Sequence, residues 1–456
     1  MPRIAHPTTG AVAALVTGLI TGLVTGTTLG APPVVVRTMP AHGDAAVDPG
    51  LREIVIEFDQ DMAPDGYSLV GGGPQFPGRD GEPAWRTPRT FVLPVALDAD
   101  QLYTFSINLG DLANFRNVDG ESAIARRLTF ITRPHDGVAT DDAVTPDTNR
   151  LALAELRAAI DERYAYRDRL GIDWSRRFDD AADTFIAAPT ARAFAVHAGT
   201  ILAEAADLHV SITVGDESIP VFGRAVSGNI AKASLARSVP DLHPVNRTVM
   251  RGTVGGDIPY LLITTWAWGA ATDLQAALDA IAEARDAPGL IIDVRPNAGG
   301  SEPLAERVAS RFVDEPRVYA KHITRDAALP GGFTPVSERV LDPAPEGERF
   351  GAGRVAVLMG PRNMSSCEAF LLMMKQSPRC RLVGARSWGS SGNPKPVALS
   401  NGVSLMLPSW QAMRPDGTVF EGEGIAPDLE VRFDPAASEA PDPVIERAAT
   451  WIRDGR

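Results

Sequence analysis

The sequence predicts a chain of more than one domain, in which an antiparallel β-sandwich precedes an α/β region with a parallel sheet covered by helices. Three observations support this prediction. The 456 residues exceed the length of one ordinary domain. Apolar residues alternate with period two between about 33 and 135, whereas fully apolar strands alternate with helical stretches further on. With 44% hydrophobic and 22% charged residues, the composition is that of a globular protein.

Charge and composition exclude several classes of partner. The net charge of −13 and the lack of basic runs argue against nucleic acid or anionic lipid as the main partner. Forty of the 44 basic residues are arginine, which leaves few candidates for a lysine general base. The four lysines are Lys232, Lys321, Lys375 and Lys395. Two cysteines, Cys367 and Cys380, are too few for a disulfide framework or a zinc cluster, so we expect no metal or other cofactor.

The N-terminus has the layout of an export signal. Residues 1–10 contain Arg3 and no acid, residues 11–29 are uncharged and largely apolar, and small residues follow. This pattern predicts a secretory signal peptide over 1–31 with cleavage near Ala31. The alternative is an uncleaved N-terminal membrane anchor, because the stretch is about long enough to span a bilayer. In both cases the rest of the chain is exported, to the periplasm or the extracellular space.

Residues 33–135 are expected to form the β-sandwich. In the segment REIVIEFDQDM, Ile54, Ile56 and Phe58 fall on one face, and similar alternation recurs in QLYTFSINL. Turn sequences such as Asp119-Gly120 separate the strands, as in antiparallel sandwiches. The stretch VVVRTMPAHGDAAVDPGLREIVIEFDQDM resembles the bacterial Ig-like domains that precede enzymes on exported proteins, where they act as spacers or docking surfaces. Residues 136–148 have the composition of a linker.

A helical region, residues 149–215, follows this linker. Apolar residues recur at spacings of three and four from Leu153 to Tyr164, which predicts an amphipathic helix with Asp147 or Thr148 as its cap. A second helical stretch, TARAFAVHAGTILAEAAD, leads into a strand in DLHVSITV, where the period changes to two.

Residues 216–456 contain repeated strand–loop–helix units. The strand at 290–295 is followed by a PNAGG loop and a helix at 301–312, and the strand at 354–360 by a PRNM loop and a helix. Strands that are apolar throughout indicate a parallel sheet covered by helices. Ligands bind at the carboxyl ends of such strands, so these two loops are the candidate site.

The second loop delivers Ser365 and Ser366 to the first turn of a helix. A serine there is well placed as a nucleophile, because neighbouring amides can stabilise the oxyanion formed after attack. Residues 365–368 also read as an S-x-x-E capping box, which explains a serine at this position without catalysis. Of the seven histidines, His209 lies at a helix-to-strand junction, a fixed position suitable for a general base.

Four motifs in order support the catalytic reading. They are GLIIDVRPNAGG, VAVLMGPRNMSSCEAF, LVGARSWGSSGNP and TVFEGEGIAPDLEV, and the upstream L-x-x-x-x-D-x-H also matches. Together they resemble the S41 serine peptidases, which include the C-terminal processing peptidases and the tricorn core protease. The resemblance covers roughly 140–435. It implies a ClpP/crotonase-like α/β core over 216–456, a helical cap over 149–215 and a protein or peptide substrate.

The resemblance also implies roles for individual residues. Ser365 corresponds to the nucleophile, with Ser366 as the alternative. The amide of Gly299 or Gly300, together with that of Ser366, would form the oxyanion hole. Arg295 and Asn297 would hold the loop rather than react.

The sequence departs from the processing peptidases at their catalytic lysine. Ser390 occupies the lysine's place, and Lys395 lies five residues further on, between two prolines. The tricorn-like branch instead uses a histidine from the cap, here His209, and a glutamate near the end, best matched by Glu421. That branch has a serine directly before its histidine, where this chain has Leu208. The implied mechanism is a Ser-His-Glu arrangement acting through an acyl-enzyme, with Ser390 in a supporting position.

A second hypothesis belongs to a different class of protein. The family includes members that keep the fold without peptidase activity, and the missing lysine motivates this reading here. The chain would then be a catalytically inactive S41-fold protein that binds peptides or small hydrophobic ligands.

Overall fold

The computed structural model describes residues 31–135, 140–224, 226–433 and 440–455. The predicted export segment lies outside these residues except for Ala31, as does the part of the predicted linker at 136–139. Within the described ranges, no helix is both long enough and apolar enough to cross a bilayer.

The N-terminal region is built from two small antiparallel sheets around one core. The first sheet contains β1 (Val35–Met39), β2 (Glu53–Phe58), β4 (Gly78–Arg79), β5 (Ala84–Thr87) and β6 (Thr90–Ala96). The second contains β3 (Leu69–Val70), β7 (Leu102–Ile107) and β8 (Arg126–Ile131). The alternating residues Ile54, Ile56 and Phe58 are buried in the shared core, which supplies most of the stabilisation of so small a unit.

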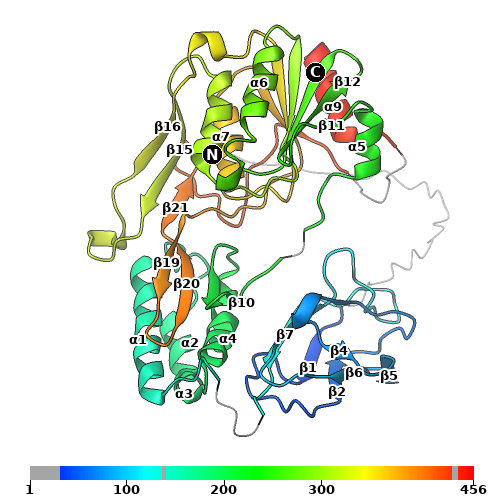
Figure 1. Ribbon diagram of the computed structural model, residues 1–456, viewed down its shortest axis with the longest axis vertical. Helices are drawn as coiled ribbons and strands as arrows, with labels where there is room; N and C mark the ends of the chain where they lie inside the picture. Colours follow the sequence, from blue (N-terminus) through cyan, green and yellow to red (C-terminus); the bar gives the residue numbers. More distant parts are fainter. Residues whose placement is uncertain (1–30, 136–139, 225, 434–439, 456) are drawn as a thin grey trace, which may run out of the picture.

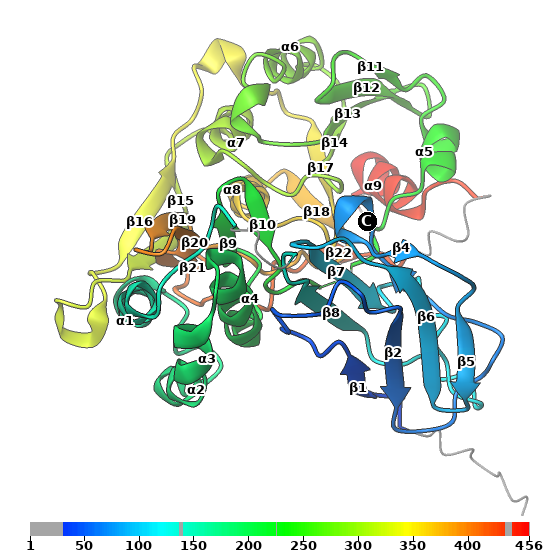
Figure 2. The same ribbon diagram turned by 60° about the horizontal axis from the view of Figure 1, so that its bottom comes forward.

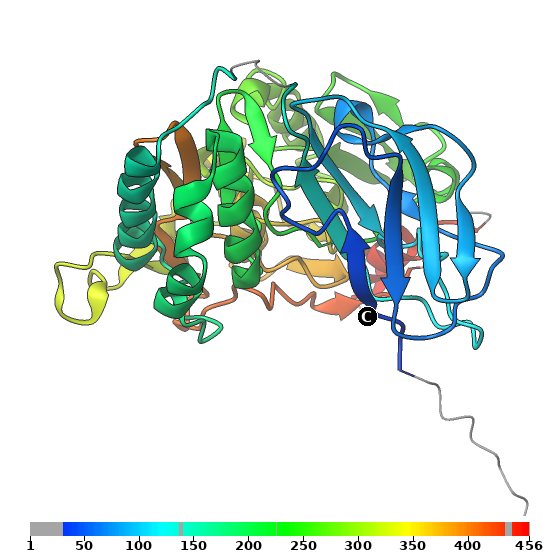
Figure 3. The ribbon, with the colours of Figure 1, turned by 90° about the horizontal axis from the view of Figure 1, so that it is seen from below.

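Four helices follow in the chain. Figures 2 and 3 show them on the opposite side of the molecule from most of the strands of the N-terminal region. They are α1 (Pro146–Arg163), α2 (Trp174–Asp180), α3 (Ala182–Ala187) and α4 (Ala191–Leu202). Thr145 caps α1 by accepting a hydrogen bond from the Thr148 amide at 3.1 Å, so the prediction of Asp147 or Thr148 as the cap is wrong. An ion pair between Arg192 and Asp100 connects α4 to the N-terminal region.

The helices pack against a four-stranded antiparallel sheet whose strands come from two distant parts of the chain. Its order is β10 (Glu217–Ile219), β9 (Ser211–Val214), β20 (Val403–Pro408) and β19 (Pro394–Ala398). Figure 1 shows β19 and β20, in orange, between α1 and α4. One hydrophobic cluster joins Leu156 and Phe194 of the helices to Leu405 of β20. The segment at 394–408 is therefore part of the helical region.

The largest sheet has seven strands in the order β11-β12-β13-β14-β17-β18-β22. These are β11 (His243–Pro244), β12 (Val249–Val254), β13 (Ile258–Ile263), β14 (Gly289–Asp293), β17 (Arg354–Met359), β18 (Cys380–Gly384) and β22 (Leu429–Glu430). The strands from β13 to β22 are parallel, as predicted from their apolar sequences, and β11 and β12 are antiparallel. The carboxyl ends of β14 and β17, at the centre, lie side by side and lead into the candidate loops.

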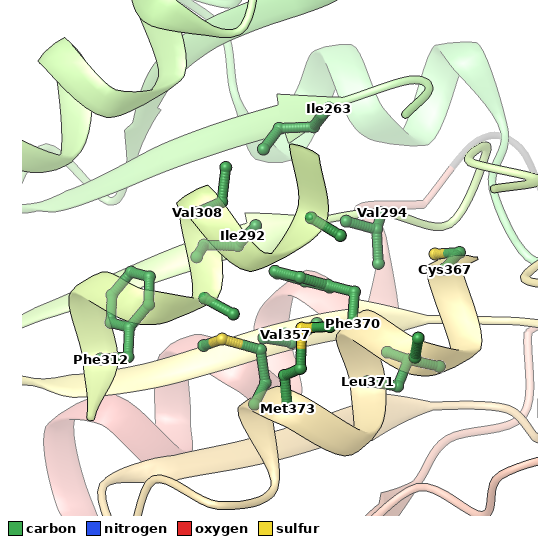
Figure 4. Packing of buried hydrophobic residues seen from close by; sticks show 14 of the residues in the cluster. Ile263, Ile292, Val294, Val308, Phe312, Val357, Cys367, Phe370, Leu371 and Met373 are labelled. Carbon is green, nitrogen blue, oxygen red and sulfur yellow. The ribbon is translucent and has the colours of Figure 1, made fainter. Parts of the chain in front are cut away.

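Helices cover both faces of this sheet. One face is packed by α6 (Gln275–Glu283), α7 (Glu302–Ala309) and α8 (Ser366–Met374), and the other by α5 (Lys232–Ser238) and α9 (Pro443–Asp454). Figure 4 shows Phe370 and Met373 of α8 among Ile292, Val308 and Val357. All nine residues of α8 are buried, so the position of its N-terminus is fixed by packing. A further sheet of β15 (Arg317–Thr324), β16 (Ser337–Leu341) and β21 (Trp410–Met413) lies beside α7 and α8.

A buried ion network anchors the loop after β14. The Arg295 side chain has no exposure to solvent, and its Nη2 lies 2.7 Å from Asp293 Oδ2 while its Nη1 lies 2.8 Å from Asp442 Oδ2. Nη1 also donates to the Asn229 carbonyl at 2.8 Å, and the Tyr260 hydroxyl donates to Asp293 at 2.6 Å. Arg295 is thus fully engaged in contacts within the fold.

We expect Asp442→Asn to lower the free energy of unfolding by about 3–5 kcal/mol, because it leaves a buried guanidinium with one carboxylate fewer. Asp442 also caps α9, but asparagine caps helices equally well, so this variant isolates the charge. Urea denaturation monitored by circular dichroism measures the effect. The exposed Glu446 in the same helix provides the control, since Glu446→Gln should stay within about 0.5 kcal/mol of the wild type. Equal effects of the two variants would show that the network contributes little.

Candidate active site

Two loops at the carboxyl ends of β14 and β17 are joined by asparagine side chains. Asn363 Nδ2 donates to the Val294 carbonyl at 2.6 Å and to the Asn297 carbonyl at 3.0 Å. Asn297 Oδ1 in turn accepts from the Gly299 amide at 2.8 Å. The loops approach so closely that a Cβ on Gly299, whose φ is +103°, would lie 2.7 Å from the Met364 carbonyl oxygen and 3.0 Å from the Ser365 Cβ. Glycine is therefore required there on steric and conformational grounds.

Ser365 directly precedes α8 in an unusual backbone conformation, with φ 56° and ψ −130°. Such a conformation costs on the order of 1–3 kcal/mol for a non-glycine residue and is concentrated at functional sites. The Ser365 amide donates to the Ser390 carbonyl at 2.7 Å, which holds the strained turn in place. The Ser365 side chain makes no cap hydrogen bond, so the interpretation of Ser365 as the capping serine of residues 365–368 is wrong.

Two amide groups next to Ser365 are available to a ligand. Among the described residues, the amides of Gly300 and Ser366 have no hydrogen-bond acceptor, whereas the Gly299 amide is occupied by Asn297. Ser366 Oγ donates to the Gly300 carbonyl at 2.6 Å and so fixes the two amides relative to each other. Gly300, Ser365 and Ser366 line one cavity of about 430 Å³. Unpaired amides beside a serine hydroxyl are the arrangement that stabilises an oxyanion.

His209 reaches this region from the segment between α4 and β9. Its Nδ1 lies 2.7 Å from Ser390 Oγ, and its amide donates to Asp207 Oδ1 at 2.9 Å. Burial lowers the pKa of His209, and the nearby Asp207 carboxylate opposes this shift only in part, so the imidazole is neutral at neutral pH. The Ser365 hydroxyl makes no hydrogen bond to any described residue, His209 included. The structure thus brings His209 to Ser390, the residue whose carbonyl holds Ser365.

Glu421 lies on the other side of the Ser390 segment. Its Oε2 accepts a hydrogen bond from the Ser391 amide at 2.8 Å, and it makes no hydrogen bond to His209. Burial raises the pKa of Glu421 well above its usual value, and the charge of Asp207 raises it further. Its contact with the histidine is therefore indirect, through the backbone of the 390–391 segment.

Two buried acids were not assigned by the sequence analysis. The first is Asp207, in the D-x-H motif, which also accepts from the Tyr164 hydroxyl at 2.9 Å. The second is Glu368, which is fully buried in α8. Its Oε1 accepts from Ser387 Oγ at 2.5 Å and from the Gly389 amide at 2.7 Å, and its Oε2 accepts from the Ser390 amide at 3.0 Å. Glu368 thus fastens the segment carrying Ser390 to the helix that carries Ser365.

Burial raises the pKa of Glu368 to about 7, although the hydrogen bonds that its carboxylate accepts oppose the shift. The ordinary value of 4.5 applies in the unfolded chain, so the folded protein binds more protons at this site between about pH 4.5 and 7. The contribution of Glu368 to stability is therefore fully present below pH 4.5 and is lost as the pH rises through 7. We expect Glu368→Gln to remove this component.

In urea denaturation between pH 4.5 and 7.5, the difference in unfolding free energy between wild type and Glu368→Gln should change by on the order of 2–3 kcal/mol. The variant loses one acceptor at every pH, but that loss shifts the curve without changing its slope. Glu423→Gln, at an exposed acid near the same segment, should give a curve parallel to the wild type. A parallel curve for Glu368→Gln would contradict the raised pKa.

The lysine alternative lies away from these groups. Lys395 is exposed on β19, and it does not line the cavity that contains Ser365. Lys321 pairs with Glu338, and Lys375 with Asp428. No lysine of the described ranges forms a hydrogen bond with Ser365.

Comparisons with known proteins find similarity over the α/β part of the chain. Residues 257–431 match the model of peptidase family S41. The chain is 24% identical over 178 residues to the carboxy-terminal processing protease CtpB of Bacillus subtilis, an alignment covering 39% of this chain and 35% of that protein. It is 23% identical over 214 residues to the chloroplastic carboxyl-terminal-processing peptidase 3 of Arabidopsis thaliana, covering 46% and 39%. The chain therefore spans little more than a third of the length of these curated relatives.

The fold also has a solved counterpart. The crystal structure of a candidate peptidase from Parabacteroides merdae matches with a TM-score of 0.56 and 22% identity, covering 68% of this chain and 97% of that one. Residues 257–431, which make up most of the α/β part of the chain, are therefore similar to peptidase family S41, a family of serine-type hydrolases.

Proposed function

We propose that this protein is an exported serine peptidase that hydrolyses peptide bonds through an acyl-enzyme on Ser365. The observation that carries the proposal is the strained serine at the start of α8, which shares one cavity with the unpaired amides of Gly300 and Ser366. The names of the curated relatives, which are processing proteases, support a protein or peptide substrate.

In this mechanism His209 is the general base. We assign the Nδ1 proton to the contact with Ser390 Oγ, 2.7 Å away, which leaves Nε2 to take the proton of Ser365. As the hydroxyl attacks the substrate carbonyl, the amides of Gly300 and Ser366 donate to the developing oxyanion. The imidazolium then protonates the leaving amine, and a water activated by the same histidine hydrolyses the acyl-enzyme.

Buried acids support the histidine from a distance. The Asp207 carboxylate lies close enough to favour the protonated imidazole, and it therefore stabilises the imidazolium that forms during attack. We assign Glu421 a supporting role through the Ser391 amide, and Glu368 the task of holding Ser390 beside Ser365. Ser390, Asp207, Glu421 and Glu368 are positioning residues, since none of them contacts the reacting atoms.

The domain division is part of the same proposal. Residues 1–31 form the export signal, and 33–135 an Ig-like domain that acts as a spacer or docking surface. The linker at 136–148 ends earlier than its predicted boundary, because residues 146–148 already belong to α1. Residues 149–215 form a cap, which the strands at 394–408 complete, and the remainder of 216–456 forms the peptidase core. The cap supplies His209, and the core supplies Ser365.

A second candidate is a catalytically inactive S41-fold protein that binds peptides or small hydrophobic ligands. The missing hydrogen bond between His209 and the Ser365 hydroxyl favours it. Incubation with a serine-directed fluorophosphonate distinguishes the two functions. The peptidase proposal predicts one covalent adduct, which mass spectrometry of tryptic peptides maps to Ser365 and which is lost in Ser365→Ala. No adduct on the folded wild type would favour the binding protein.

A further inference from the structure

We infer that the cavity beside Ser365 is a specificity pocket that selects a lysine or arginine side chain on the acyl side of the cleaved bond, through the carboxylate of Glu306. The inference rests on the proposed function for the position of the scissile bond. It adds the class of substrate that the site accepts.

The pocket extends from the nucleophile along helix α7. That helix begins two residues after Gly300, and its Glu302 and Glu306 both line the cavity that contains Ser365. Because the two glutamates are four residues apart, they lie on the same face of the helix, one turn or about 6 Å from each other. A side chain attached next to a carbonyl bound by the Gly300 amide must therefore be long to reach Glu306.

Only one of the two glutamates is neutralised by a cation. The lining of this cavity contains three charged residues, Glu302, Glu306 and Arg339. Arg339 pairs with Glu302, and its guanidinium is held over the rings of Tyr319 and Trp410, at 5.2 and 5.1 Å from their centroids. Glu306 accepts from the Tyr319 hydroxyl at 3.0 Å and has no cationic partner among the described residues. The formal charges of these three side chains sum to −1, so one negative charge in the lining is not balanced by a cation.

A buried hydroxyl in the same lining independently points to a ligand. Ser301, between Gly300 and Glu302, is 1% exposed, and its Oγ has no hydrogen-bond partner among the described residues. A buried polar atom without a partner is costly, so a donor or acceptor from a bound molecule would stabilise it. Trp410 and the exposed Trp268 add aromatic walls. Such walls suit the aliphatic stem and charged end of lysine or arginine.

The test compares two blocked hexapeptides that differ only in lysine or norleucine at the residue before the cleaved bond. Norleucine has the same stem without the ammonium group, so the ratio of kcat/KM values isolates the charge. The wild type should prefer lysine by at least about tenfold, and Glu306→Gln should reduce this ratio to near one. Glu338→Gln, at an acid outside the cavity, should keep the wild-type ratio. Fluorophosphonate labelling of each variant shows that it has folded.

A binding measurement separates this inference from the proposed function. Fluorescence anisotropy in the Ser365→Ala background should show tighter binding of the lysine peptide, and the added Glu306→Gln change should abolish that difference. If the protein binds the lysine peptide selectively but does not cleave it, the peptidase function is refuted and the lysine-specific pocket is supported. The inference would be overturned, and the peptidase function retained, if the protein turned over substrates, or was labelled, without any preference for lysine. The same holds if it preferred acidic residues or free C-terminal carboxylates, or if its preference applied to the residue after the cleaved bond.

Discussion

Replacing Ser365 with alanine should reduce kcat/KM for peptide hydrolysis by at least about 10⁴-fold while leaving the fold intact. The substitution removes the hydroxyl that would form the acyl-enzyme, and no other described serine has the same combination of a strained turn and adjacent free amides. The Ser365 hydroxyl makes no hydrogen bond to a described residue, so its loss should change the unfolding free energy by less than about 0.5 kcal/mol. Steady-state kinetics and thermal unfolding measure the two effects.

The neighbouring serine provides the matched comparison. Ser366 Oγ bonds to the Gly300 carbonyl, so Ser366→Ala loosens the oxyanion site without removing the nucleophile. We expect a loss of about 10- to 100-fold in kcat. Retained turnover in Ser365→Ala would reject Ser365 as the nucleophile. If Ser366→Ala is the inactive variant, the nucleophile is Ser366 instead.

The substitution His209→Gln should also reduce kcat by on the order of 10⁴-fold, because glutamine can still bond to Ser390 but cannot accept the proton of Ser365. In the wild type, burial lowers the pKa of His209, so the base is already neutral below pH 6.5. The acid limb of the kcat/KM profile should therefore have its midpoint below 6.5. Ser390→Ala, which frees Nδ1, should lower kcat by about 10- to 100-fold and move this limb.

Two control variants complete the test of the base. His243 is an exposed histidine whose Nδ1 contacts the Asp241 carbonyl, and His243→Gln should keep the wild-type rate. Lys395→Ala should likewise have no effect on the rate. Substantial activity in His209→Gln, together with inactivity of Lys395→Ala, would instead identify the lysine as the base.

The strands of the α/β core could be predicted because the sequence of each segment is enough to identify it as a buried strand. The expected strands at 290–295 and 354–360 correspond to β14 and β17, shifted by one or two residues at most. Their uninterrupted apolar sequences suit only a strand covered on both faces. The pairing of β9 with β20, by contrast, joins residues nearly 200 positions apart. Its register is set by packing against the helices, which no local pattern encodes.

The polar contacts of the site were harder to predict for a related reason. Glu368 satisfies a local capping pattern, yet its carboxylate bonds to residues 19 to 22 positions away. The sequence likewise offered Gly299 and Gly300 as equal candidates for the oxyanion hole. In the folded chain the Asn297 side chain accepts a hydrogen bond from the Gly299 amide, so the Gly300 amide is the one left free. Both outcomes depend on which partners the folded chain brings within hydrogen-bond distance.

In the proposed mechanism a serine, two amides and an imidazole converge on one reacting carbon. A crystal structure of the protein inactivated by a peptidyl fluorophosphonate tests this convergence most directly. We expect phosphorus bonded to Ser365 Oγ, with its oxygen within about 3 Å of the Gly300 and Ser366 amides. We also expect a His209 ring nitrogen within hydrogen-bond distance of Ser365 Oγ. The proposed mechanism would be contradicted by an adduct on another residue. It would also be contradicted by an adduct on Ser365 whose oxygen contacts neither amide and which has no imidazole beside it.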